Sequence, residues 1–274
     1  MTTRRCNGIG SPGSAEASDN LTAGPSTLAI QDLTVGFGGR RVLGPVTLTF
    51  PLRQMSVLIG AAGSGKSVLL RAFNRLVTLQ PGAEITGRIL MGGLDIFDPG
   101  LMSAELRRRI GMVFAVPTPL PMSVRANIAF AMRLHGRPGR ATLTGAIEES
   151  LRRVGLWPAM RERMNRHAAT LGCGEQQLLC IARALAIGAE ILLLDDPTQT
   201  LDPAEVARLE AVLGELKSQM TIIMATSQLP FAARSADLIV LLQDGLVVEA
   251  DSPARLLTGA RDPRAIAYLA GRIG

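Results

Sequence analysis

The chain has 274 residues, of which 47% are hydrophobic and 3% aromatic, and it carries a formal net charge of +6. This length suffices for one large α/β domain or two small ones with a sizeable core. The longest apolar run, near residues 191–194, is far shorter than the ~20 residues that span a bilayer, and no secretory signal is visible. Scarce aromatic side chains and scattered arginines argue against a nucleic-acid partner. We therefore expect a soluble, cytoplasmic protein.

Strand and helix patterns alternate along the chain. Residues 1–27 are rich in Ser, Gly, Ala and Thr, which predicts a disordered leader before one domain over residues 28–274. Strand patterns occur at 28–30, 33–35, 46–50, 56–59, 191–194 and 221–226, with a turn at 36–39 and hairpins near 87–93 and 238–248. Helices are expected at 124–134, 142–154, 181–187 and from residue 203 onward. The alternation predicts a mainly parallel sheet, with a helical subdomain at about 99–185.

The strongest motif follows the expected strand at 56–59. It fits G-x-x-x-x-G-K-[ST] and consists of Gly60, Ala61, Ala62, Gly63, Ser64, Gly65, Lys66 and Ser67, with Val68 next. The apolar residues after it recur at the spacing of one helix face. A chance Gly-rich turn before a helix is the alternative. Strand, loop and helix in this order, however, are what a phosphate-binding P-loop requires.

The chemistry of such a loop comes from its backbone. Glycines adopt turn geometries that a Cβ would hinder, so the N–H groups of the loop converge on phosphate oxygens. The positive end of the following helix dipole adds to this attraction. Lys66 can reach the β- and γ-phosphates, and the Ser67 hydroxyl can ligate Mg²⁺. The sequence thus predicts a site for Mg²⁺ and ATP.

A second motif is the apolar strand at 191–194, which ends in Asp195 and Asp196. An acid at the end of a core strand can hold Mg²⁺ beside the P-loop serine. The alternative is an acid that only caps the next turn. Because a P-loop precedes it at a suitable distance, we favour Asp195 as a Mg²⁺ ligand.

With these motifs the chain resembles an ATP-binding subunit of an ABC transporter, and most closely the phosphate-import subfamily. The finer likeness is carried by residues 69–76 with 81–83, 106–114 with 119–123, and 268–274. The resemblance covers residues 28–274. It implies an α/β P-loop ATPase core, a small antiparallel β portion and a helical subdomain.

The resemblance also implies roles for matching residues. Phe37 stands where an aromatic ring stacks on adenine, although it could simply pack the turn. Asp202 matches an acid of the loop after the catalytic strand, although helix N-capping would explain it equally well. The implied partners are integral-membrane permease subunits, a second ATP-binding subunit and, indirectly, a phosphate-binding protein. The implied location is the cytoplasmic face of the membrane.

The departures from the family pattern concern catalysis. Ala115 replaces a glutamine, and residues 171–175 read Leu-Gly-Cys-Gly-Glu where the family has Leu-Ser-Gly-Gly-Gln. Asp196 replaces the catalytic glutamate and is one methylene shorter. Ser227 replaces a histidine that senses the γ-phosphate. Asp196 and Ser227 are therefore degenerate candidates for the catalytic positions.

Three functional interpretations follow. The first is an ATPase that powers phosphate import through a permease. The second is a degenerate nucleotide-binding subunit that hydrolyses little, as a homodimer or beside a competent paralogue. The third is a soluble ABC-type protein of DNA repair or translation, which the single nucleotide domain and the phosphate-import-like C-terminus disfavour.

Overall fold

The computed structural model describes residues 28–136 and 138–272, and the expected leader at 1–27 lies outside them. The strands are β1 Leu28–Phe37, β2 Arg40–Phe50, β3 Met55–Ile59, β4 Ala83–Met91, β5 Leu94–Asp95, β6 Ile110–Val113, β7 Ile191–Asp195, β8 Thr221–Ala225, β9 Leu238–Gln243 and β10 Leu246–Asp251. The α-helices are α2 Lys66–Phe73, α3 Ser103–Arg109, α4 Val124–Leu134, α5 Arg140–Arg153, α6 Trp157–Met160, α7 Cys173–Ala186, α8 Pro203–Leu216, α9 Leu229–Ser235, α10 Pro253–Gly259 and α11 Pro263–Leu269. Short 3₁₀ turns cover Val77–Leu79 and Ala168–Thr170.

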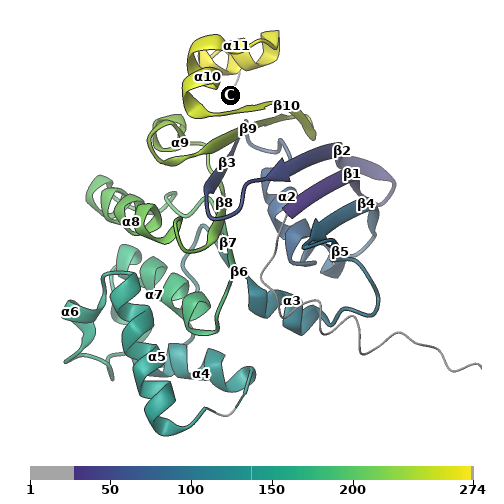
Figure 1. The fold of residues 1–274 in the computed structure, drawn as a ribbon. Helices are drawn as coiled ribbons and strands as arrows, with labels where there is room; N and C mark the ends of the chain where they lie inside the picture. Colours follow the sequence, from purple (N-terminus) through teal and green to yellow (C-terminus); the bar gives the residue numbers. More distant parts are fainter. Residues whose placement is uncertain (1–27, 137, 273–274) are drawn as a thin grey trace, which may run out of the picture.

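Two sheets organise the fold (Figure 1). The larger sheet has the order β10-β9-β3-β8-β7-β6, and all its neighbouring pairs are parallel except β10 with β9. The smaller sheet is antiparallel and has the order β2-β1-β4-β5. The expected α/β core and small antiparallel portion are confirmed.

Alternating side chains of the central strands feed two apolar clusters. Ile191 and Leu193 of β7 pack with α2 and the antiparallel sheet, where Phe73 meets Phe50 edge to face at 5.3 Å. Leu192 and Leu194 pack with α4, α5, α7 and α8 on the opposite face. The parallel strands are therefore packed on both faces, by helices on one side and by α2 with the antiparallel sheet on the other. This packing holds the ends of the strands in place.

Two details differ from the sequence patterns. The strand β1 continues through the expected turn because Gly36 and Phe37 pair with β2 on one side and β4 on the other, which leaves only residues 38–39 as the turn. Residues 110–113 form β6, an edge strand inside the mainly helical range 99–185. Among residues 28–136 and 138–272, no helix is both long enough and apolar enough to cross a bilayer.

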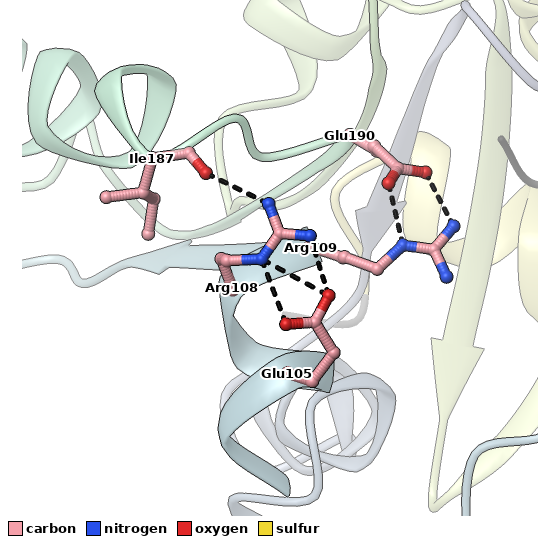
Figure 2. A network of polar contacts seen from close by, with 5 residues as sticks. All are labelled: Glu105, Arg108, Arg109, Ile187 and Glu190. Carbon is pink, nitrogen blue, oxygen red and sulfur yellow. Dashed lines mark hydrogen bonds and ion pairs between the residues drawn. The ribbon is translucent and has the colours of Figure 1, made fainter. Parts of the chain in front are cut away.

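An ion pair between the buried Arg109 and the half-buried Glu190 joins the end of α3 to the residue before β7 (Figure 2). Arg109, whose side chain is 2% exposed, donates to both carboxylate oxygens of Glu190 at 2.6 and 2.8 Å. The Glu190 N–H also donates to the Arg109 carbonyl at 2.8 Å. Beside it, Arg108 pairs with Glu105 and donates to the Ile187 carbonyl. These contacts anchor β6 at the edge of the parallel sheet.

Replacing Glu190 with Ala is expected to lower the free energy of unfolding by about 3 kcal/mol, because the Arg109 guanidinium would stay buried without its carboxylate. Urea unfolding at neutral pH measures this loss. Glu148→Ala is the matched control, since it breaks an exposed pair with Arg152 and should cost less than about 1 kcal/mol. Equal losses for the two variants would contradict a buried role for the pair.

Candidate nucleotide site

The predicted P-loop, Asp195, Asp196 and Ser227 lie at the carboxyl ends of the parallel strands, whereas Phe37 belongs to the antiparallel sheet. The P-loop follows β3, Asp195 ends β7, and Thr226 follows β8. Because β3, β8 and β7 are parallel neighbours, their carboxyl ends lie side by side. Ligands of open α/β sheets bind outside such ends. Sequence reasoning identified the loop and the aspartates, and the topology brings them together.

The glycines of the loop meet a steric requirement. Gly60 has φ of 143°, and a Cβ there would overlap the carbonyl oxygen of Leu242 in β9. Gly65 has φ of 99° and is the N-cap of α2. Side chains at these positions would be strained, so the tight turn from strand to helix depends on glycine.

Lys66 folds back over the loop. Its ammonium group donates to the carbonyls of Gly60 at 2.6 Å and Ala61 at 2.7 Å, and to the Ser64 hydroxyl at 3.2 Å. Burial lowers the pKa of Lys66, while the nearby carboxylates of Asp196 and Asp195 oppose this shift. An anion at the loop would replace carbonyl dipoles as the partner of this cation, which is a stronger pairing.

Ser67 and Asp195 are in direct contact. The Ser67 hydroxyl donates to one carboxylate oxygen of Asp195 at 2.6 Å, and Arg71 reaches the other at 3.4 Å. Asp195 is 8% exposed, so its charge is held in place by these partners. A hydroxyl and a carboxylate oxygen this close fit Mg²⁺, which prefers oxygen ligands and binds through one or two protein groups plus water.

Asp196 lies next to this pair in an unusual backbone geometry. Its φ is 48°, its N–H donates to the Ala225 carbonyl at 2.8 Å, and its carboxylate accepts from the Thr226 hydroxyl at 3.3 Å. Burial raises the pKa of Asp196, partly opposed by the Thr226 hydrogen bond and the Lys66 charge. A raised pKa makes a carboxylate a better proton acceptor.

Two other predicted residues, Ser227 and Phe37, are more exposed than Asp195. Ser227 is exposed just beyond Thr226, at the same edge of the sheet. Phe37 is half-buried at the end of β1, beside the turn at 38–39. Adenine stacking by Phe37 stays a prediction.

The start of α7 is contacted by a residue of α8 that sequence reasoning missed. Glu205 of α8 accepts a hydrogen bond from the Gly174 N–H at 2.9 Å with one carboxylate oxygen and from the Asp202 N–H at 3.2 Å with the other. A Cβ at Gly174 would approach the Glu205 carboxyl group to 2.8 Å. Glu175 accepts from the Gly172 N–H at 3.3 Å. Two carboxylates of the chain itself therefore occupy amides at the N-terminus of α7.

A family model described as ABC transporter matches residues 43–199, more than half of the chain. The chain belongs to the ABC transporter family. The matched region contains the P-loop, Asp195, Asp196 and the start of α7. The ABC ATPase fold expected from the motifs is thus confirmed, and the chain is an ATP-binding domain of this transporter family.

Two solved structures are similar in fold. One is cbiO1 from Clostridium perfringens, described as part of the ABC transporter complex cbiONQ, with a TM-score of 0.74 and 24% identity over 89% of this chain and 96% of that chain. The other is a bacterial Atm1-family ABC exporter with ATP bound, with a TM-score of 0.75 and 22% identity over 91% of this chain and 42% of that chain. This chain thus spans less than half of the exporter chain. At these identities the likeness concerns the fold alone.

Proposed function

We propose that this ABC protein is the ATP-binding subunit of an importer and couples ATP binding and hydrolysis to phosphate uptake through a membrane permease. The observation that supports nucleotide binding most strongly is the 2.6 Å contact between Ser67 of the P-loop and Asp195 at the end of β7. It joins the two motifs across 128 residues of sequence. Lys66→Ala and Asp195→Asn test this proposal through their effects on the affinity for Mg·ATP.

Each site residue has a role in the proposal. The amides of residues 63–67 and the Lys66 ammonium bind the phosphates. Ser67 and Asp195 would hold Mg²⁺, which would supply positive charge beside the phosphates. Asp196 would accept a proton from water, and Ser227 would lie on the γ-phosphate side of the site. Phe37 supports the adenine.

Phosphate as the solute rests on the stretches that resemble the phosphate-import subfamily, at 69–76 with 81–83, 106–114 with 119–123, and 268–274. In this proposal the chain works at the cytoplasmic face of the membrane. It contacts permease subunits and a second ATP-binding subunit, and reaches a phosphate-binding protein only through the permease.

The segment at 115–123 is the proposed permease contact. Asn127, which is fully buried, accepts a hydrogen bond from the Leu120 N–H at 2.7 Å and donates to the Leu120 and Ser123 carbonyls. Arg183 donates to the Thr118 carbonyl at 3.2 Å. The backbone is thus fixed from within while Val116 is 62% exposed. A shaped loop with an exposed apolar side chain suits a protein interface.

Thr118→Cys is expected to form a cross-link with a cytoplasmic loop of the phosphate permease from the same organism, in membranes that contain both proteins. Cys6 and Cys173 should first be replaced by Ser to remove competing thiols. Ser218→Cys, an exposed position after α8, is the control and should not react with the permease. Equal cross-linking from Thr118→Cys and Ser218→Cys would contradict the proposed contact. So would a lack of cross-linking from every position in 115–123.

The second candidate function is a nucleotide-binding subunit that hydrolyses ATP poorly. A specific observation favours it: Glu175 and Glu205 accept hydrogen bonds from the Gly172 and Gly174 amides. In the family this helix start faces the triphosphate held by the partner subunit. Two carboxylates there repel such a triphosphate. ATP turnover by the unmodified chain separates the two functions.

A further inference from the structure

The C-terminal helix α11 is held firmly against the parallel sheet. The carboxylate of Glu249 in β10 accepts from the N–H groups of Arg261 at 3.0 Å and Asp262 at 3.2 Å. Ala265 is fully buried, and Tyr268 packs on the larger apolar cluster. Figure 1 shows α11 beside α10, next to β10 at the end of the chain. The position of Tyr268 is therefore set by several independent contacts.

The phenol of Tyr268 touches the first residue of the P-loop. The N–H of the buried Gly60 donates to the phenolic oxygen at 3.2 Å, across 208 residues of sequence. The Gly60 carbonyl accepts from the Lys66 ammonium at 2.6 Å. On a third side, the Leu242 carbonyl leaves no room for a Cβ. Gly60 is thus confined by β9, by Lys66 and by the C-terminal helix.

The hydroxyl of Tyr268 is the hydrogen-bond acceptor of the buried Gly60 N–H group. The β3–β9 ladder ends at the pair Ile59 and Leu241, so Gly60 leaves the sheet with an N–H that requires another acceptor. A buried amide without a partner is costly. Burial raises the pKa of Tyr268 although the Gly60 bond opposes it, so the phenol stays neutral at physiological pH.

We propose that Tyr268 is a positioning residue of the nucleotide site: its hydroxyl fixes the Gly60 peptide, so the loop amides are ordered before phosphate arrives. This inference rests on the proposed function in one respect, namely that the P-loop binds ATP. Lys66 must leave the Gly60 carbonyl to reach a phosphate. The hydrogen bond from the Gly60 N–H to Tyr268 then still holds the Gly60 peptide in place. A loop ordered in advance loses less entropy on binding.

The test compares the full chain with Tyr268→Phe, which keeps the ring and removes only the hydroxyl. Titration calorimetry with Mg·AMP-PNP at 25 °C should give about three- to tenfold weaker binding for the variant, the range expected for one hydrogen bond. Ile266→Ala on the same helix, where the side chain is 51% exposed, should bind as the wild type does. The thermal midpoint of the variant should fall by only about 2–4 °C.

A second measurement follows the Gly60 amide directly. Hydrogen exchange of the Gly60 amide in the wild-type chain should be slow, and it should speed up in Tyr268→Phe. Equal affinity of the wild type and Tyr268→Phe, or a Gly60 amide that exchanges freely in the wild type, would overturn the role of Tyr268 while ATP binding stands. A wild-type chain that does not bind Mg·AMP-PNP would overturn both proposals.

Discussion

Replacing Lys66 with Ala is expected to weaken the binding of Mg·ATP by at least about 100-fold. The ammonium group is the cation of the loop, and each hydrogen bond between charged groups contributes about 1.5–3 kcal/mol. In the chain it contacts two loop carbonyls and lies near Asp195 and Asp196, so it already lies in the loop that is proposed to bind the phosphates. Titration with Mg·ATP measures the change.

Lys217→Ala is the matched control, because Lys217 is the other lysine of the chain and pairs with Asp237 away from the loop. Its affinity for Mg·ATP should stay within about twofold of the wild type, as is usual for surface substitutions away from a site. If Lys66→Ala bound Mg·ATP as tightly as this control, the assignment of the P-loop would be wrong.

Restoring the family residues at the altered positions is expected to raise ATP turnover by about 100-fold or more. The set is Ala115→Gln, Gly172→Ser, Cys173→Gly, Glu175→Gln, Asp196→Glu and Ser227→His. The Asp196 carboxylate is one methylene short, and a misplacement of about 1 Å can cost about 100-fold in rate. Asp196→Glu alone should recover little, because groups that act as one unit fail together.

Phosphate release at saturating Mg·ATP, with the permease in membranes, measures this turnover. Lys66→Ala added to the restored chain should abolish the gain, which controls for contaminating ATPases. Adding Glu205→Gln should raise turnover further, since it weakens the acceptor on the Gly174 amide. Robust hydrolysis by the unmodified chain would contradict the importance of these departures and favour an ordinary import ATPase.

The local motifs made the residues of the candidate nucleotide site recognisable from sequence. The glycines, Lys66 and Ser67 lie within eight consecutive residues, and Asp195 ends a short apolar strand. The topology then places Ser67 beside Asp195, as expected from the order of strands and helices. The hairpin at Asp244-Gly245 and the helix after Asp202 also follow from short-range rules of turns and caps.

Contacts between distant segments could not be predicted in this way. The capping box of Asp202 and Glu205 marks Glu205 as the third residue of α8, but no local pattern predicts its bond to the Gly174 amide, which depends on α7 and α8 lying side by side. Tyr268 reaches Gly60 only because α11 folds back on the sheet. Residues 110–113 are too few to show a strand period, and β6 forms because β7 offers a free edge.

The most direct test of the account is the Mg²⁺ dependence of ATP affinity. The affinity of the unmodified chain for ATP should rise at least about tenfold when Mg²⁺ replaces EDTA, because Ser67 and Asp195 supply oxygen ligands beside the phosphates. In Asp195→Asn this dependence should be lost while weak ATP binding through the loop amides and Lys66 persists. No ATP binding by the unmodified chain, or the same Mg²⁺ dependence in both proteins, would contradict a Mg·ATP site at this edge of the sheet.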